Sequence, residues 1–168
     1  QIGRRHRRRR GGPRRVRGRT ILERVVRRVT DSERLGGVIV VTDNSPENAF
    51  VLREVPLDVP VYAGHQADPL GRFAGALDKY QAESVVRVRG ENPFVDPGLI
   101  DRLVTVAECH IDCDYIGDCS RDGRPAILSP VGVYAEWFKT SALRRAGSCV
   151  SACCAARSSS EPVRSASS

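Results

Sequence analysis

The stretch that decides the fold is "VVRVRGENPFVDPGLIDRL", residues 85–103. Its first part is a short run rich in β-branched residues, which is typical of a strand buried inside a sheet. Gly90 then allows a sharp turn, and Pro93 restricts the residue before it to an extended conformation. Asp96 supplies a capping carboxylate and Pro97 a first-turn proline. The stretch therefore predicts a strand, a polar turn and a helix.

The same alternation of apolar strand and amphipathic helix recurs on both sides of this stretch. Strands alternating with helices of about ten residues favour a parallel sheet covered by helices, with ligands bound beyond the carboxyl ends of the strands. Helices are predicted at 20–30, from Ser45-Pro46 to about Val55, after Asp68-Pro69 and from Pro97 to about Ala107. Strands are predicted in "VIVVT" (38–42), "VPVYAG" (59–64), "SVVRV" (84–88) and "DYIG" (114–117).

Length and charge favour one domain with two unusual ends. The chain has 168 residues and a net charge of +7, and ten arginines without an acid lie in residues 1–20. We expect a disordered arginine-rich arm at 1–19, an α/β domain at 20–146 and a disordered Ser/Ala/Cys tail at 147–168. No apolar run reaches the roughly 20 residues of a membrane span, so we expect a cytoplasmic protein.

The six cysteines lie in the C-terminal third of the chain. This distribution is unlike the framework of a small secreted scaffold, so we expect reduced thiols. Cys109, His110 and Cys113 suggest a zinc site, but a structural zinc site normally needs four ligands in two close pairs. We therefore favour free thiols over metal ligands at these positions.

The turn at residues 90–92 places polar side chains at the carboxyl end of a predicted strand. Asp43 and Gly64-His65 follow the earlier strands in the same way. A carboxylate at this edge, such as that of Glu91, can hold Mg²⁺, which binds one or two carboxylates together with substrate phosphates. The residue type alone is equally consistent with a solvated loop acid. For Asp96 the capping role is the favoured one.

The order of several segments resembles the cytidylyltransferases of the acylneuraminate (CMP-sugar synthetase) and spore-coat polysaccharide biosynthesis type. The similarity covers residues 18–146 and is most specific from Arg87 to Asp101. The segments that carry it are "GRTILERVVRRV", "VIVVTDNSPEN", "VPVYAGHQADPLGRFAGAL", "VVRVRGENPFVDPGLIDRLV", "DYIG" and "PVGVYAEWFKTSALRRA".

This resemblance implies an α/β fold, the Rossmann-like sandwich of nucleotide-diphospho-sugar transferases, with a mostly parallel sheet between helices. It also implies a magnesium-dependent nucleotidyltransferase that joins CMP from CTP to a sugar acid or related sugar and releases pyrophosphate. In such reactions positioning and electrostatics carry the catalysis. The resemblance further implies a homodimer, formed through the region of "SPVGVYAEWF".

The resemblance also implies roles for individual residues. The metal-binding aspartate of the family falls on Glu91, and a second family acid falls on Glu136, whose partner acid is replaced here by Ala135 or Tyr134. Positions near the nucleotide, its phosphates and the sugar fall on Asp68, Arg72, Arg87, Arg89 and Asn92, with Arg87 and Glu91 as the catalytic candidates. Taken alone, Asp68 is better explained as a helix cap, and Arg87 as a structural ion-pair partner within a strand.

The N-terminal segment departs from the family. Members begin with a buried strand and a glycine-rich loop that holds the triphosphate, whereas this chain has "RRHRRRRGGPRRVRGR" at residues 4–19. We therefore expect the first strand and the nucleotide loop to be missing, and the activity of this chain to be impaired. One hypothesis is that both ends are off-frame translation of GC-rich DNA. The alternative is a nonenzymatic arginine-tailed module that binds RNA or another polyanion.

Overall fold

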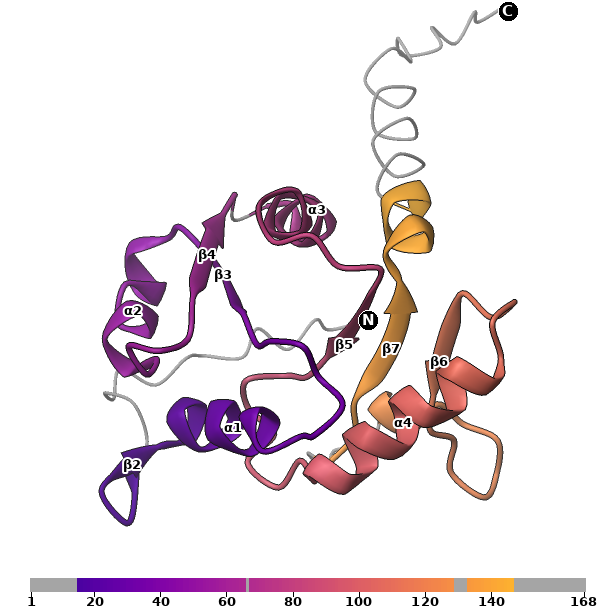
Figure 1. Cartoon of the computed structure of the whole chain (residues 1–168). Helices are drawn as coiled ribbons and strands as arrows, with labels where there is room; N and C mark the ends of the chain where they lie inside the picture. The colour runs from indigo at the N-terminus through magenta and orange to yellow at the C-terminus, as the bar shows by residue number, and fades with distance from the viewer. Residues whose placement is uncertain (1–14, 66, 129–132, 147–168) are drawn as a thin grey trace, which may run out of the picture.

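The computed structural model describes residues 15–65, 67–128 and 133–146, and Figure 1 labels their elements along the chain. The strands are β1 (Arg15–Val16), β2 (Arg19–Thr20), β3 (Val40–Asp43), β4 (Val61–Gly64), β5 (Ser84–Arg87), β6 (Tyr115–Gly117) and β7 (Glu136–Lys139). The helices are α1 (Ile21–Thr30), α2 (Val51–Glu54), α3 (Pro69–Lys79) and α4 (Pro97–Cys109), with 3-10 turns at Pro46–Asn48 and Ala126–Leu128. The order of strands and helices confirms the predicted α/β fold.

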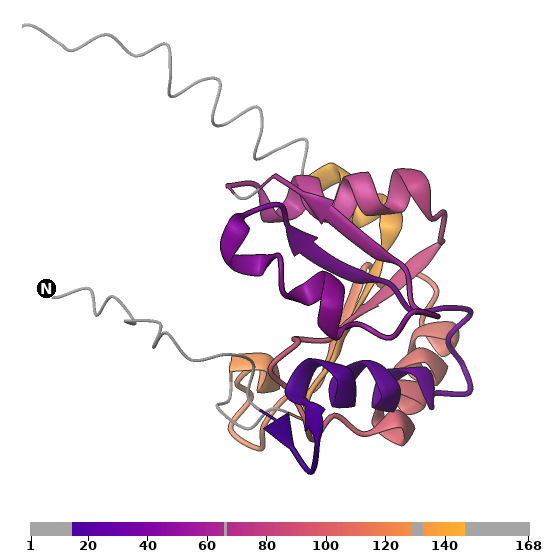
Figure 2. The same cartoon turned by 90° about the vertical axis from the view of Figure 1, so that its left-hand side faces the viewer.

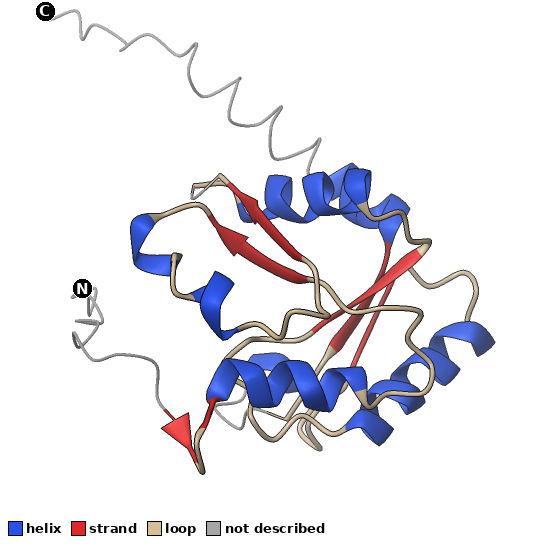
Figure 3. Cartoon of the chain, turned by 60° about the vertical axis from the view of Figure 1, so that its left-hand side comes forward, coloured by secondary structure: helices blue, strands red, loops and turns tan. Residues whose placement is uncertain are grey.

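The strands behind the first hairpin form two separate sheets. β3 and β4 pair in parallel, with Val40 opposite Val61 and Asp43 opposite Gly64. The other sheet has the order β5-β7-β6, and β7 runs antiparallel to both neighbours, so β5 and β6 are parallel to each other. Figure 3 shows the strands in red with helices around them. The predicted parallel arrangement therefore holds for these strands except β7.

Helices lie on both sides of the strands. Figure 2 shows α3 on one side and α1 with α4 on the other. One core cluster joins α1 and α4 to β7 and includes Val25, Ile100, Leu103 and Trp137. A second, smaller cluster packs Val26 of α1 against α2. Helices thus cover the strands on both sides, as in an α/β sandwich, although β3, β4 and β5 contain no fully buried residue.

Polar caps fix the starts of three helices. Thr20 accepts a hydrogen bond from the Glu23 amide at the start of α1. Asp68 and Asp96 cap α3 and α4 through bonds of 2.8 and 2.9 Å from the amides of Gly71 and Gly98. The sequence predicted the caps at Asp68 and Asp96, because each of these residues precedes a proline at the first helical position. For α1 it predicted a helix over residues 20–30 but no capping residue.

The prediction of one continuous helix from Ser45 to about Val55 is wrong. A 3-10 turn at Pro46–Asn48 is followed by the short α2, and the Ser45 side chain makes no capping bond. The Ser45 hydroxyl donates instead to the carboxylate of Asp43, two residues earlier. This local bond competes with capping, a general property of serine beside an acid.

Residues 15–19 were predicted as part of a disordered arm, and the structure corrects this boundary. β1 and β2 pair antiparallel around Arg17 and Gly18, which both have positive φ values of 50° and 81°. Two central residues with positive φ are the requirement of a tight hairpin turn, and Gly18 meets it without strain. Residues 1–14 and 147–168 lie outside the described residues, so the remaining arm and the tail stay predictions.

Candidate functional site

A cleft lies between β3 and β5. Its volume is about 1090 Å³, and its walls come from α1, β3, α3 and β5. At the end where β5 leads into α4, Gly90 and Glu91 line the cleft, and Thr42 lines it from β3. This is the edge at which α/β folds bind ligands, beyond the carboxyl ends of strands.

Glu91 is exposed at this edge of the cleft. Its carboxylate has no hydrogen bond or ion pair with the residues that the structure describes. A free carboxylate beside an open cleft is able to contact a cation or a donor group of a bound molecule. The metal-binding role of Glu91 stays a prediction, and the described part of the chain holds no cluster of three or more potential ligands.

Asn92, next to Glu91, is buried, and its role in the fold is to hold the turn. Its side-chain amide donates to the Tyr134 carbonyl at 3.2 Å, and its backbone amide donates to the Arg89 carbonyl at 3.0 Å. Its own carbonyl accepts from the amide of Val95, a residue with no exposed surface. These three bonds fix the backbone on both sides of the turn. They therefore also fix the backbone position from which the Glu91 side chain extends.

Glu136, the second predicted metal ligand, is engaged by protein groups on both carboxylate oxygens. Arg87 donates to Oε2 at 2.6 Å, and the Tyr115 hydroxyl donates to Oε1 at 3.1 Å. The three residues lie on β7, β5 and β6, so this ion pair ties the three strands of one sheet together. The alternative that the sequence left open for Arg87, a structural ion pair, is what the structure shows, although Arg87 also lines the cleft.

Burial and charge both act on Tyr115. The pKa of its phenol is raised, first by burial and then by the nearby negative charge of Glu136. A phenol is protonated at neutral pH even at its ordinary pKa of about 10, so the Tyr115 hydroxyl is a donor to the carboxylate, and the raised pKa extends this state to higher pH. Sequence analysis did not select Tyr115, because its partners lie on strands that are distant in the sequence.

A second polar group forms where β3 and β4 end. Asp43 accepts from the Ser45 hydroxyl and amide, and these bonds, with a smaller effect from Arg72, hold the pKa of its carboxyl below its ordinary value. Arg72 of α3 donates to the His65 carbonyl at 2.8 Å. The structure thus brings Arg72 to the end of the parallel pair, whereas Asp68 serves as the cap of α3.

The predicted site residues therefore divide between two places. Arg87 and Glu91 line the cleft between β3 and β5, and Asn92 supports the turn between them. Neither Arg72 nor Asp68 belongs to the residues that line this cleft. The signal for Asp43, a polar residue directly after a strand, was visible in the sequence, but its bond to Ser45 was not.

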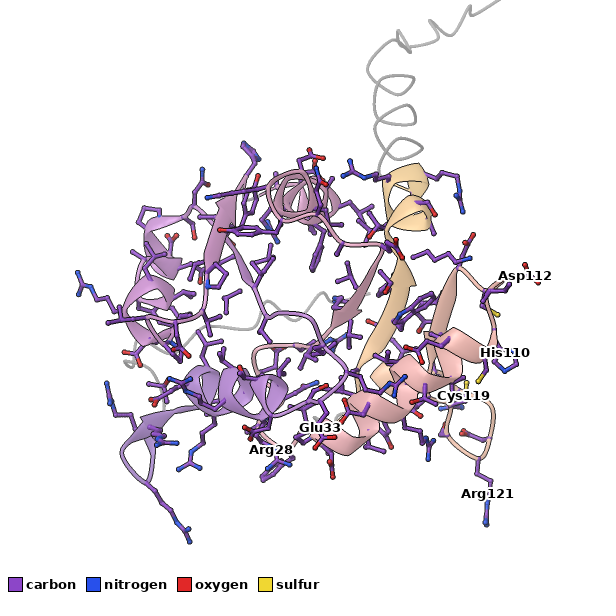
Figure 4. All side chains as sticks on the ribbon, in the orientation of Figure 1. Arg28, Glu33, His110, Asp112, Cys119 and Arg121 are labelled. Atoms are coloured by element: carbon purple, nitrogen blue, oxygen red, sulfur yellow. The ribbon has the colours of Figure 1, made fainter. Side chains whose placement is uncertain are left out.

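The cysteine-rich segment lies away from this cleft. Figure 4 shows His110 and Asp112 beyond the end of α4, with Cys119 on the neighbouring loop. The thiols of Cys109, Cys113 and Cys119 are exposed and free, and no metal-binding group was found among the described residues.

No helix in the described part of the chain is both long and apolar enough to cross a membrane.

Comparison with known proteins places these features in a family. The sequence model of the cytidylyltransferase family matches residues 14–110.

An uncharacterized protein of Methanocaldococcus jannaschii is 38% identical over 87 residues, which cover 51% of this chain and 36% of that protein. The 3-deoxy-manno-octulosonate cytidylyltransferase of Chlorobium phaeobacteroides is 30% identical over 86 residues, covering 51% and 34%. The spore coat polysaccharide biosynthesis protein SpsF of Bacillus subtilis is 27% identical over 97 residues, covering 55% and 39%. The chain thus spans little more than a third of the length of these curated relatives.

Solved structures support the fold. A cytidylyltransferase from Leptospira borgpetersenii superposes with a TM-score of 0.66 at 22% identity, covering 77% of this chain and 53% of that one. A CMP:2-keto-3-deoxy-manno-octonic acid synthetase superposes with a TM-score of 0.61 at 12% identity, covering 80% and 69%. At such identities the likeness concerns the fold alone. Because the family model matches more than half of the sequence, this chain belongs to the cytidylyltransferase family.

Proposed function

We propose that the cleft edge around Glu91 takes part in the transfer of CMP from CTP to a sugar acid or a related sugar, with release of pyrophosphate. Membership of the cytidylyltransferase family supports the nucleotide, and a relative named 3-deoxy-manno-octulosonate cytidylyltransferase supports a sugar acid as acceptor. The observation that carries the proposal is the free, exposed carboxylate of Glu91 at the carboxyl end of β5.

The donor set of this edge fits a hard divalent cation shared with a nucleotide. Mg²⁺ keeps several waters and commonly uses one or two carboxylates plus substrate phosphates, so one free protein carboxylate is sufficient as an anchor. Glu91 would hold the ion, which neutralises phosphate charge when bound. Glu136, whose two oxygens are already engaged, contributes by keeping Arg87 in place.

The residues around Glu91 determine how accurately the carboxylate is placed. The bonds of Asn92 to Tyr134 and Arg89 fix the turn before α4, and Asp96 fixes the start of that helix. A turn held at both ends presents Glu91 with little loss of conformational entropy on ligand binding. Arg87, held by Glu136, adds a positive charge inside the cleft, where phosphate groups would be attracted.

The remaining features of the proposal rest on family membership. Arg72 and Asp43 lie where the parallel pair β3 and β4 ends, a suitable place for a second part of the substrate. We also propose a cytoplasmic location and a homodimer, which the family resemblance implies. The RNA-binding alternative rests mainly on residues 1–14, which lie outside the described residues, and stays a prediction.

Titration calorimetry with CTP tests the proposal directly. CTP should bind the parent chain with MgCl₂ present and bind much more weakly with EDTA. Glu91→Gln should weaken the magnesium-dependent binding by about tenfold or more, equivalent to about 1.4 kcal/mol, because it removes the anchoring charge.

Glu33→Gln is the matched control, because Glu33 is also exposed but does not line the cleft. It should bind like the parent. Equal binding by Glu91→Gln and the parent would disprove the role of Glu91, and binding unaffected by EDTA would disprove the metal dependence.

A further inference from the structure

The first hairpin and the helix that follows it carry an excess of positive charge. Residues 15–34, which include β1, β2 and α1, hold seven arginines against three acidic residues, an excess of four positive charges. The family model matches this segment, because its match begins at residue 14. The excess therefore does not depend on the arginine-rich stretch before the hairpin. A local excess of one sign of charge favours partners of the opposite sign.

Four of these arginines lie on one side of the molecule. Figure 1 and Figure 2 both show the hairpin projecting from the start of α1 at the edge of the molecule. Figure 4 shows Arg28 on the lower side of the view, where the hairpin also lies. The buried residues of α1 are valines, and Arg24 and Arg28 lie one turn apart off this buried face. We call four residues the basic face: Arg17, Arg19, Arg24 and Arg28.

Protein groups neutralise little of the charge on the basic face. Arg17, at the hairpin turn, is exposed and has no hydrogen bond or ion pair with the residues that the structure describes. Arg19 lies 3.5 Å from the carboxylate of Glu23, and its side chain is 63% exposed. An exposed ion pair of this kind contributes little, so a phosphate can replace the carboxylate at small cost. Arg28 donates to the uncharged carbonyl of Val95, which leaves its positive charge in place.

The stability of α1 does not explain these arginines. Side chains four residues apart on a helix are neighbours, and two like charges at this spacing destabilise the helix slightly. Arg24 and Arg28 form such a pair. A surface that places like charges side by side is well suited to a partner whose own charges are closely spaced.

The chemistry of the segment favours a nucleic-acid duplex over other polyanions. Residues 15–34 contain no aromatic residue, so they offer no stacking surface for the bases of a single strand. The three buried valines of α1 belong to the core, so they are not available to anchor the helix in a lipid surface. A duplex presents about one negative charge per 1.7 Å of its axis, which is dense enough for every arginine of the basic face to meet a phosphate.

The shape of the hairpin favours DNA over RNA. β1 and β2 form a two-stranded ribbon that turns at Arg17 and Gly18. The major groove of B-DNA is about 12 Å wide and admits a two-stranded ribbon, whereas the major groove of duplex RNA is deep and narrow. An arginine at the turn of a ribbon is therefore better placed to reach the phosphates that border a DNA groove.

We propose that the basic face binds duplex DNA through its phosphate backbone, with the hairpin directed into the major groove and without selection of base sequence. The guanidinium groups donate to phosphate oxygens, and such charge-assisted bonds are stronger than those between neutral groups. None of the four arginines belongs to the described residues that line the cleft beside Glu91. The inference concerns a separate surface and does not depend on the proposed cytidylyl transfer.

A salt series with the full chain tests this inference. The probe is a fluorescein-labelled DNA duplex of about 20 base pairs, and fluorescence anisotropy measures its binding between about 50 and 200 mM NaCl. Each phosphate contact contributes about −0.9 to the slope of log K against log salt. Arg17→Gln combined with Arg19→Gln should therefore make the slope less steep by about 1.8 and weaken binding about tenfold or more at about 100 mM NaCl.

The matched control is Arg121→Gln combined with Arg124→Gln. Both double variants lower the net charge by two, and both pairs contain an arginine at a turn and an arginine in an exposed ion pair. Figure 4 shows Arg121 on the loop after β6, at the opposite side of the view from the hairpin. The control should keep the slope of the parent chain, because its arginines lie away from the basic face.

Two measurements on the parent chain need no variant. Addition of the duplex should slow hydrogen exchange in β1, β2 and the first turn of α1. The same anisotropy assay should show weaker binding of a single DNA strand and of an RNA duplex of the same sequence. Saturating CTP with MgCl₂ should not displace the DNA, because the cleft and the basic face share none of the four arginines.

Four results would overturn the inference. They are equal salt slopes for the two double variants, protection confined to other elements, tighter binding of the single strand or the RNA duplex, and displacement of DNA by CTP. A failure of CTP to bind would count against the proposed function alone and would leave the DNA measurements unchanged.

Discussion

Replacing Glu136 by glutamine should destabilise the chain, because this carboxylate joins three strands. Its side chain is only 8% exposed, and it accepts bonds from Arg87 on β5 and Tyr115 on β6. Glutamine has nearly the same shape but no charge. In one of the two orientations of its side-chain amide, the amide nitrogen would face the Arg87 guanidinium, which is also a donor. The substitution therefore removes the ion pair with little change in packing volume.

The magnitude can be estimated from these two bonds. A hydrogen bond to a charged group contributes about 1.5–3 kcal/mol. The Arg87 side chain is 37% exposed, so water can partly replace its bond, and the lower half of that range applies. The half-exposed Tyr115 adds about 0.5 kcal/mol. We expect a loss of about 2 kcal/mol in the free energy of unfolding, or about 4–8 °C in Tm for a chain of this size.

Urea unfolding followed by fluorescence measures this loss, because the single tryptophan, Trp137, is buried next to Glu136 on β7. Glu108→Gln is the matched control, since Glu108 forms an ion pair with Arg34 in which both side chains are exposed. Such exposed pairs contribute little. A loss below about 0.5 kcal/mol for Glu136→Gln, or equal losses for both variants, would refute the reasoning.

Three further predictions concern the core and the pH dependence. Ile100→Ala removes a side chain with 0% exposure and should cost about 2–5 kcal/mol in urea unfolding, whereas Val106→Ala on the exposed face of α4 should cost much less. Because burial raises the pKa of Tyr115, spectrophotometric titration should show its phenol ionising above the ordinary value of about 10, and the stability linked to it should be lost as pH rises through the folded-state pKa. The hydroxyl of Ser32 lowers the pKa of Asp101, so this carboxyl stabilises the fold above its ordinary pKa and loses the effect as pH falls through the lowered value. Asp101→Asn should therefore reduce the dependence of the free energy of unfolding on pH in the acidic range. An unchanged dependence in that range would contradict this prediction.

Local chemistry made several parts of the fold predictable. Asp68 and Asp96 cap α3 and α4 where the sequence placed them, because a cap needs only residues within one helical turn. The β-branched runs gave the positions of β3 and β5 to within two residues at their starts. The helix expected after Ser45 divided into a 3-10 turn and a short helix, because Ser45 bonds to Asp43 instead of capping.

The candidate site was predictable only in part. Glu91 could be selected because a turn after a strand presents its side chain at the sheet edge, and the structure exposes it there. The environment of Glu136 could not be predicted, since Arg87 and Tyr115 are 49 and 21 residues away in sequence. The burial of Asn92 likewise depends on the Tyr134 carbonyl, 42 residues away.

The sequence by itself determined the order of strands and helices, the starts of α3 and α4 and the exposed acid after β5, because these follow from interactions between residues close in the chain. Only the tertiary structure decided that β7 lies between β5 and β6, that Glu136 is shared by Arg87 and Tyr115, and that β3 and β5 border one apolar cleft. The physical reason is that strand pairing and the burial of charge are set by partners distant in sequence, which local patterns do not specify.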